Sequence, residues 1–432
     1  PLRTTGPGVL IAFGVGVTLV YLTLSALSEL TTAHPARGSF RAYAEQAFGP
    51  LAGFVVGWVY WGGLILAMSS EAVAVALFAR LWLPGVPVWL ISLTVVLLVS
   101  AINLLDVAKF SLIESVMAAV KVLAVLGFIL VMAVSLLGLL PGKPFVGLGA
   151  IRTESFLPTG LRGLFGSMLP VFFTFAGFEV LGMAAPDAEE PARTVPRAVT
   201  LTVVSQLVLY MGAMLATLAV LAPGEVPRDT SPMVATLLRV GLYPLATILN
   251  IVVMTAAITT MLAATYSLSR MLASLAEERQ APAALALLTP GGAPRNALLV
   301  SSGFMLLGVL LSYLLPHQVY LFLVSAGGFS LIFAYLVILA SHLVIRRRQG
   351  GCTPGMCQMT TYPYGNWVGI LLTGGAIVTM PLVPGQGAGL AAGVVLVIAA
   401  TAAYLLRSRS RRPLSPQRAA AEEATDDRLL LR

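Results

Sequence analysis

The sequence predicts an all-α protein that crosses a membrane many times, and two observations support this prediction. First, 58% of the 432 residues are hydrophobic and only 10% are charged, whereas about a quarter are charged in a typical soluble domain. Second, the apolar residues form about eleven runs near the roughly 20 residues that a spanning helix needs, so the chain is polytopic. The runs lie at residues 8–30, 52–79, 86–104, 110–140, 160–184, 198–221, 243–274, 297–315, 318–345, 366–384 and 386–406.

Arginine residues follow several of these runs and predict how the chain is threaded through the membrane. They are Arg193, Arg197, Arg346, Arg347, Arg348 and the group from Arg407 onward. The positive-inside rule places such regions in the cytoplasm, and an even number of runs separates them. We therefore expect a transmembrane domain over residues 1–406 and a disordered cytoplasmic tail over residues 407–432. This topology, with contact to anionic lipid, explains the net charge of +8 without nucleic acid.

Counting the runs backward from the loop at residues 185–197 places Pro1 outside the cell. Five runs precede that loop, and the chain begins with neither methionine nor a signal peptide. We therefore expect an upstream segment that contains one more span. The alternative is that the stretch from Pro170 to Pro186 re-enters the membrane instead of spanning it.

Residues 169–197, LPVFFTFAGFEVLGMAAPDAEEPARTVPR, have the features of a broken membrane helix. Gly177 weakens the apolar helix, and Glu179 lies within the apolar run. A carboxylate inside a span usually faces a cavity or a partner, and backbone groups freed by a break are tolerated where they line a site. Many secondary transporters hold small polar substrates at such discontinuous helices. This stretch therefore predicts a transporter.

Nine segments, in order along the chain, resemble the amino acid permeases of the APC (amino acid–polyamine–organocation) superfamily. They read GPGVLIAF, LSELTTAHPARGSFRAYAEQAFGPLAGFVVGWVYW, SSEAVAVALF, LPGVPVW, FSLIESVMAAVKVLAV, FTFAGFEVLGMAAPDAEEPARTVPRAV, YSLSRMLASLAEERQAP, FLVSAGGFSLIFAYLVILASHLVIRRR and TTYPYGNWVGILL. Within the superfamily, the likeness is strongest to the bacterial amino acid transporter family of GABA, aromatic, lysine and proline permeases. The resemblance implies a LeuT-type fold with two five-helix inverted repeats and twelve spans, of which the runs are the second to the twelfth. The Gly-rich first helix, which in the family holds part of the substrate, has no counterpart in this sequence.

The resemblance implies that the broken sixth family helix forms part of the substrate site. The residues at the break are Phe173, Thr174, Phe175, Ala176 and Gly177. The small residues allow close backbone approach, and freed carbonyl groups can accept hydrogen bonds from an ammonium group. One of the two phenylalanines stacks over the substrate or closes the pocket. The alternative is that both aromatic side chains only pack an ordinary bundle helix.

Four charged residues within the runs are candidates for coupling transport to protons. Glu179 is expected to respond to protons or to latch helices together, and the alternative is a bracing role. Lys121 matches a position where sodium-coupled relatives bind an ion, which implies sodium-independent or proton-coupled transport, or else a static ion bridge. Glu114 lies two helical turns earlier on the same face and either relays a proton or anchors that end. Glu71 is equally suited to bracing and to coupling.

The eighth family helix departs from the pattern of the relatives. They usually carry an Asn-Ser pair where this chain has Leu262 and Ala263. Thr259 and Thr260 lie one turn earlier and are expected to supply supporting hydroxyl groups near Lys121. A smaller and more apolar substrate pocket is one consequence.

Two segments between the runs are expected to form short helices. Residues 31–48 are predicted to be an amphipathic helix at the inner mouth, where Arg37 and Arg41 contact either lipid headgroups or acidic residues such as Glu189 and Glu190. The segment EVPRDTSPMVATLLRVG resembles an external lid helix.

The predicted function is transport of amino acids across the cell membrane, by proton-coupled symport with alternating access. Two alternatives stay open: an exchanger or exporter of amino acids or amines on the same fold, and a non-transporting truncated copy or scaffold. An enzyme is not expected, because the sequence has no HExxH motif, no nucleophile elbow and no clustered histidines. The expected partners are an amino acid, protons and membrane lipid. No metal or cofactor is expected, with free thiols at Cys352 and Cys357 and interfacial histidines at His34, His317 and His342.

Overall fold

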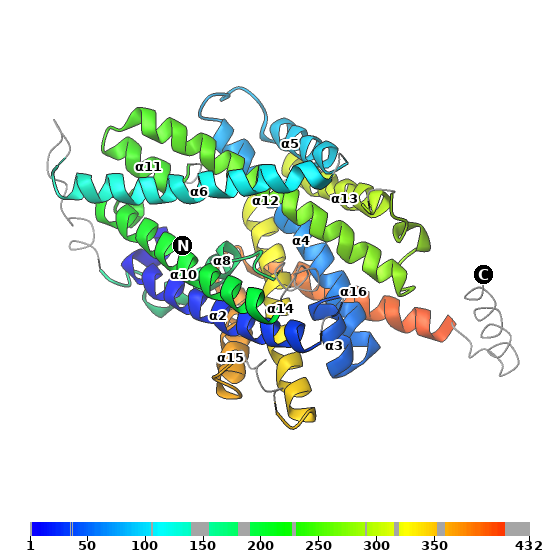
Figure 1. Cartoon of the computed structure of the whole chain (residues 1–432). Helices are drawn as coiled ribbons and strands as arrows, with labels where there is room; N and C mark the ends of the chain where they lie inside the picture. The colour runs from blue at the N-terminus through cyan, green and yellow to red at the C-terminus, as the bar shows by residue number, and fades with distance from the viewer. Residues whose placement is uncertain are drawn as a thin grey trace, which may run out of the picture.

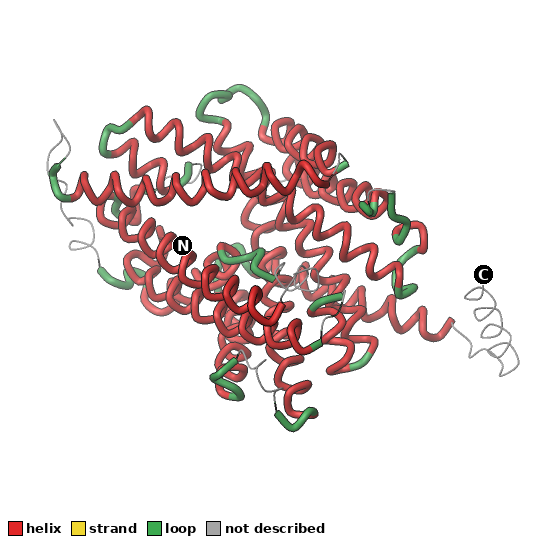
Figure 2. Tube along the Cα trace, viewed as in Figure 1, coloured by secondary structure: helices red, strands yellow, loops and turns green. Residues whose placement is uncertain are grey.

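The computed structural model describes residues 2–34, 36, 38–104, 107–139, 155–179, 191–226, 230–289, 292–314, 319–351 and 359–410. Within these ranges all regular structure is helical (Figure 2). Eight of the described helices are long and apolar enough to cross a membrane, and two further apolar helices are shorter. The prediction of an all-α, multi-pass membrane protein is therefore confirmed.

The long helices coincide with the predicted runs. They are α2 (Val9–Ala33), α4 (Pro50–Ala79), α5 (Val88–Asn103), α6 (Val107–Leu136), α8 (Gly160–Thr174), α10 (Pro191–Val220), α12 (Tyr243–Glu277), α13 (Arg295–Leu314), α14 (Val319–Arg348), α15 (Tyr364–Thr379) and α16 (Gly387–Ser410). The run predicted over residues 160–184 is helical only to Thr174, and turns follow as far as Glu179. The last helix reaches Ser410, beyond the predicted domain boundary at residue 406.

Short helices connect the long ones. They are α1 (Leu2–Thr5), η1 (Gly6–Gly8), α3 (Phe40–Phe48), η3 (Pro223–Glu225), α11 (Pro232–Arg239), η4 (Ala283–Leu285) and η5 (Met380–Leu382). The helices expected within residues 31–48 and before the eighth family helix are thus present as α3 and α11. Gly49, with a φ of +93°, ends α3, and Pro50 starts α4, because proline is favoured at a helix start.

Helices α4 and α14 form the centre of the bundle. In the most apolar 18-residue stretch of each, 72% of the residues are buried, compared with 11% in α6 and 17% in α16. Figure 1 shows α6, α10 and α2 as successive neighbours on one side of this centre. The peripheral helices therefore present apolar surface outward, which suits a lipid environment.

Small residues set the spacing around α14. A Cβ on Gly327 would lie 2.9 Å from both the backbone nitrogen and the Cβ of Ala67 on α4. On the other side, a Cβ on Gly389 of α16 would lie 2.8 Å from the backbone nitrogen of Ala326. Membrane helices use such small residues to bring their backbones together. Helix α14 is therefore held closely between α4 and α16.

One end of the bundle carries a set of arginine residues, and we call it the Arg-rich end. Arg41 of α3 contacts Glu278, just beyond α12, and the Arg348 side chain donates to the backbone oxygen of Gln46 at 3.2 Å. Arg407 of α16 donates to the backbone oxygen of Arg279. Helix α3 and the final turns of α12, α14 and α16 therefore meet at this end.

Candidate functional site

The structure breaks α8 within the predicted segment. Pro170 has no N–H group for the Gly166 carbonyl, and the Gln386 side-chain amide donates to that oxygen instead, at 2.8 Å. The helix ends at Thr174, and Gly177 has a φ of +106°, a conformation that other residues adopt only with strain. The chain thus leaves the helical path next to Glu179.

Glu179 is fully buried and joins three parts of the fold. One carboxylate oxygen accepts a hydrogen bond from the Tyr60 hydroxyl of α4 at 3.0 Å. The other accepts from the Tyr335 hydroxyl of α14 at 3.1 Å and from the Gly177 N–H at 3.0 Å. The Phe178 ring also stacks on Tyr335, with centroids 4.7 Å apart. The carboxylate therefore fastens the turn after α8 to the two central helices.

Three aromatic rings enclose the other side of the break. Phe175 lies edge-on to Phe13 of α2 at 5.8 Å and to Tyr210 of α10 at 5.1 Å. The Tyr210 hydroxyl donates to the Thr174 backbone oxygen at 3.2 Å, so it satisfies one carbonyl group at the helix end. Gly16 of α2 leaves the space that the Phe175 ring fills. We call Phe13, Phe175 and Tyr210 the aromatic box.

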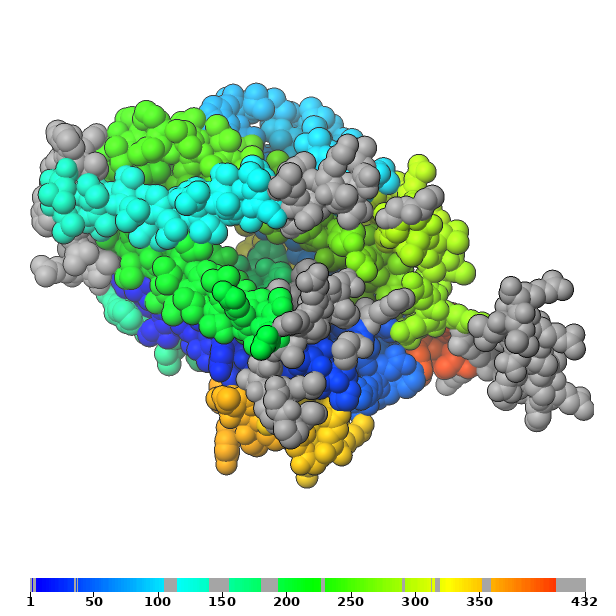
Figure 3. Space-filling model, in the orientation of Figure 1, coloured from blue at the N-terminus to red at the C-terminus, as the bar shows by residue number. Residues whose placement is uncertain are grey.

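The backbone at the break is accessible although the segment lies inside the bundle. Thr174 and Gly177 are exposed, Phe173 and Ala176 are half-buried, and a Cβ on Gly177 would meet no atom within 4 Å. The space-filling view is open between α6 and α10, on one face of the bundle (Figure 3). The backbone at Thr174 and Gly177 is therefore not covered by other described residues.

The remaining candidates lie on helices around the break. Lys121 is half-buried on α6, which packs against α10 and α12. Thr259 and Thr260 of α12 direct their hydroxyl groups to their own helix, at 3.0 Å from the oxygens of Thr255 and Ala256 respectively. The side chain of Glu114 lies outside the described residues.

Glu71 lies on α4, the helix that also carries Tyr60, and its side chain is half-buried. Glu179 is the predicted carboxylate that hydrogen bonds join to the break.

At the Arg-rich end, the predicted basic residue of α3 has a different partner from those expected. The buried Arg41 guanidinium donates to both carboxylate oxygens of Glu278, one of them at 2.6 Å, and lies 3.5 Å from Glu45. The expected partners, Glu189 and Glu190, lie outside the described residues. Burial and the nearby Glu278 raise the pKa of Glu45, and Arg41 only partly offsets this.

His342, which was expected near the membrane interface, is buried inside the protein. It is 1% exposed, and its Nε2 lies 3.1 Å from a carboxylate oxygen of Glu29 on α2. Arg346 contacts the same carboxylate at 3.0 Å, and the Met359 N–H donates to it at 3.1 Å. The Arg346 guanidinium also lies over the ring of Tyr362, 4.2 Å from its centroid. These groups join α2, α14 and the start of the α15 region.

Sequence reasoning missed both of these arrangements around Glu179 and Glu29. Nothing in the spacing of Tyr60 or Tyr335 distinguishes them from packing aromatics. His342 and Arg346 do share a helix face through their i,i+4 spacing, which was an available signal for a common partner. The pairing with Glu29, from the far end of the chain, has no local signal.

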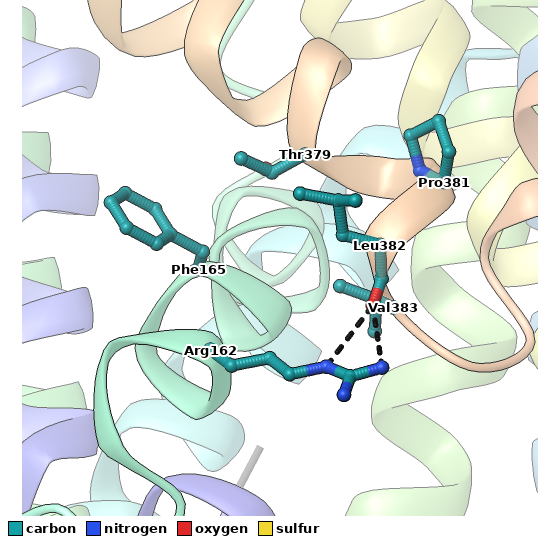
Figure 4. Close-up of a pocket in the computed structure, with 6 residues that line it drawn as sticks. All are labelled: Arg162, Phe165, Thr379, Pro381, Leu382 and Val383. Carbon is teal, nitrogen blue, oxygen red and sulfur yellow. Dashed lines mark hydrogen bonds between the residues drawn. The ribbon is translucent and has the colours of Figure 1, made fainter.

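A second recess lies at the opposite end of the bundle from the Arg-rich end. It has a volume of about 580 Å³ and is lined by Phe165 and Arg162 of α8 and by residues of η5 (Figure 4). The Arg162 guanidinium donates from Nε and Nη2 to the Leu382 oxygen at 3.3 and 3.1 Å. This arginine therefore ties α8 to η5, away from the break.

A multi-pass helical bundle with a broken helix, and a buried carboxylate beside the break, is typical of the class of secondary transporters. The fold is similar to that of LeuT-type transporter structures. One of them is a variant of the Eremococcus coleocola manganese transporter, with a TM-score of 0.55 and 14% identity, covering 94% of this chain and 88% of that chain.

The sequence comparison identifies the family. The amino acid permease profile matches residues 1–413, so the chain belongs to the amino acid permease family. It is 31% identical over 413 residues to the aromatic amino acid transport protein AroP of Escherichia coli (strain K12), covering 95% of this chain and 90% of AroP. It is 30% identical over 404 residues to the gamma-aminobutyric acid permease of Bacillus subtilis (strain 168), covering 92% and 86%. Family and fold together support amino acid transport across a membrane.

Proposed function

We propose that this permease carries an amino acid together with a proton, and that the break after α8 holds the substrate. The observation that carries the proposal is the Glu179 carboxylate, which accepts three hydrogen bonds beside an accessible stretch of backbone. Adding one proton to this carboxylate changes the hydrogen bonds that join the turn after α8 to α4 and α14.

The substrate fits the break through its charged ends. Backbone carbonyl groups near Thr174 and Gly177 accept hydrogen bonds from the substrate ammonium. The aromatic box forms the apolar wall for the side chain, and Phe173 borders the exposed backbone. Box residue Phe175 packs too tightly to admit a substrate without moving, which suits a gate.

Proton binding to Glu179 loosens the site for a simple reason. As a carboxylate, it only accepts hydrogen bonds, and all three of its partners donate. After protonation one oxygen becomes a donor, so the Tyr60 or Tyr335 hydroxyl that faces it must turn and accept instead of donating. Charge-assisted hydrogen bonds are about twice as strong as neutral ones, so the remaining contacts also weaken. The turn after α8 is then released from α4 and α14.

Lys121 and Glu114 serve as the second element of coupling. Lys121 is a half-buried cation on α6, a helix that borders the opening toward the break. An ammonium group there takes the role of a bound cation, and transport then requires no sodium. Glu114, two turns away, exchanges protons with it.

The Arg-rich end faces the cytoplasm in this proposal, and so does the C-terminus. The final turn of α14 carries Arg346, Arg347 and Arg348, and α16 ends near Arg407. The positive-inside rule supports this orientation. Helix α3 then lies at the inner mouth and α11 on the outer side.

Uptake by proteoliposomes that contain the full chain tests the proposal. Labelled amino acids should accumulate when the interior is alkaline, and Glu179→Gln should abolish the dependence on the pH gradient. Glu225→Gln, on the exposed η3, is the matched control and should transport normally. Equal counterflow with and without the gradient would indicate an exchanger, and absence of both flux and substrate binding would indicate a scaffold; either result rejects proton symport.

A further inference from the structure

A groove at the Arg-rich end, away from the break after α8, has the features of a binding site. It has a volume of about 420 Å³ and lies between α4, α16 and the segment that follows α12. Figure 1 shows α16 running beside α4 at this place. Trp58 and Gly62 of α4, with Leu396 and Ala400 of α16, form its apolar walls. A groove on the lateral surface of a membrane bundle is open to lipid rather than to water.

The length of the groove along α16 matches the thickness of one bilayer leaflet. Ring contacts pair Phe54 with Tyr404, and Gly62 lies beside Leu396, so α4 and α16 run antiparallel along it. At 1.5 Å per residue, about 16 Å of helix separates Leu396 from Arg407. Half of the bilayer hydrocarbon is about 15 Å thick. An acyl chain beside Leu396 therefore places a headgroup at the level of Arg407.

Two buried polar atoms in the groove lining have no hydrogen-bond partner. They are the Nε1 of Trp58, a donor, and the Oε1 of Gln280, an acceptor. The neighbouring Trp61 differs, because its Nε1 donates to Ser301 at 3.0 Å. Buried polar atoms without partners are rare in native proteins and often mark a group that is yet to be supplied. A ligand in this groove that offers one acceptor and one donor would satisfy both atoms.

Charge at the mouth of the groove selects the occupant. Arg407 lines the groove, and its guanidinium holds the backbone oxygen of Arg279 on the other rim. Among the described residues that line the groove none is acidic, and the nearby Glu278, which accepts from the Gln280 Nε2 at 3.2 Å, is paired with Arg41. A basic rim above an apolar channel attracts anionic lipid headgroups rather than neutral ones.

From these observations we propose that the groove binds one anionic glycerophospholipid whose headgroup carries a hydroxyl. Its phosphate pairs with Arg407, an ester carbonyl accepts from Trp58 Nε1, and the headgroup hydroxyl donates to Gln280 Oε1. One acyl chain lies along Gly62 and Leu396. The lipid thereby joins α4, part of the central pair, to the peripheral α16.

Native mass spectrometry of the delipidated full chain, titrated with phosphatidylglycerol or phosphatidylcholine, tests this proposal. One phosphatidylglycerol should bind per chain, about tenfold more tightly than phosphatidylcholine. Arg407→Gln should weaken phosphatidylglycerol binding about fivefold, and Arg407→Lys should retain most of it. Trp58→Phe keeps the ring, removes only the N–H, and should weaken binding about threefold.

Arg162→Gln is the matched control, since Arg162 also borders an apolar recess, at the other end of the bundle. It should leave phosphatidylglycerol binding unchanged. The proposal is overturned if the two lipids bind equally, or if Arg162→Gln and Arg407→Gln weaken binding alike. If Trp58→Phe binds phosphatidylglycerol as tightly as the unsubstituted protein does, Trp58 Nε1 does not donate to the ester carbonyl, and the proposed pose is rejected. These measurements need no substrate, so they do not depend on the transport proposal.

Discussion

The close approach of α4 and α14 makes a quantitative prediction about Gly327. In Gly327→Ala, the new methyl carbon would lie 2.9 Å from the backbone nitrogen of Ala67 and 3.0 Å from its Cα. Non-bonded carbon atoms prefer separations of about 3.5–4.0 Å. The helices must therefore move apart by about 0.5–1 Å, and the obstacle is backbone, which cannot rotate away.

Overpacking of this kind destabilises a protein by about 1–3 kcal/mol, and we expect about 2 kcal/mol for Gly327→Ala. Thermal unfolding of the purified permease in detergent, followed by tryptophan fluorescence, measures the effect. Gly127→Ala on the peripheral α6 is the control, because its Cβ would meet no atom within 4 Å. This substitution should be neutral, or should stabilise by up to about 1 kcal/mol.

Double substitutions separate a backbone obstacle from a side-chain obstacle. Ala67→Gly should fail to rescue Gly327→Ala, since the nitrogen and Cα of residue 67 remain in place. At Gly63, by contrast, the new methyl would overlap the side chain of Ser330, so Ser330→Gly should restore the stability of Gly63→Ala. If Gly327→Ala unfolds at the same temperature as Gly127→Ala, the helices are not packed as described, and the reasoning fails.

Other predictions concern the Arg-rich end and the break. In thermal unfolding, Glu278→Ala should cost about 1–2 kcal/mol more stability than Arg41→Met. Glu278→Ala leaves the buried Arg41 guanidinium without its main partner, whereas Arg41→Met removes the buried charge itself. Folding raises the pKa of Glu45, so its negative charge destabilises the folded state above that pKa. Glu45→Gln should therefore raise the midpoint temperature of unfolding at about pH 7.5. It should not do so at about pH 3, where the carboxyl is protonated in both the folded and the unfolded state. An equal rise at both pH values would contradict this. Gly177→Ala should cost about 1 kcal/mol through strain at φ +106° and should slow uptake, and normal uptake would show that the turn tolerates another conformation.

Hydropathy was sufficient to predict where the long helices lie, because a helix that crosses lipid must be apolar over its whole length. The predicted run at residues 52–79 and the helix α4 (Pro50–Ala79) differ by two residues at one end. The break near Gly177 was also predictable, since a glycine and a carboxylate within an apolar run are both local signals. The apolar runs and the break each depend on neighbouring residues in the sequence, so both can be predicted without knowing the fold.

Partners across the bundle were not predictable in the same way. Glu179 was identified as a site residue, but Tyr60 and Tyr335 were not, because an aromatic residue in a span usually only packs. His342 was assigned to the interface from its position near a helix end, whereas Glu29 draws it into the interior. Such pairings depend on which helix faces which, and apolar helices in lipid carry little information about their neighbours.

The close packing of α14 against α4 and α16 also fixes the distance between α4 and α14. Positions 63, 327 and 389 leave no room for a methyl group, so α4, α14 and α16 cannot slide or turn against one another without separating. We therefore expect the distance between Tyr60 and Tyr335 to stay constant during transport, while the turn that carries Glu179 approaches or leaves them. Two spectroscopic labels, one on α4 and one on α14, should therefore keep a constant separation. The distance from either label to a third label on α8 then measures how far α8 moves.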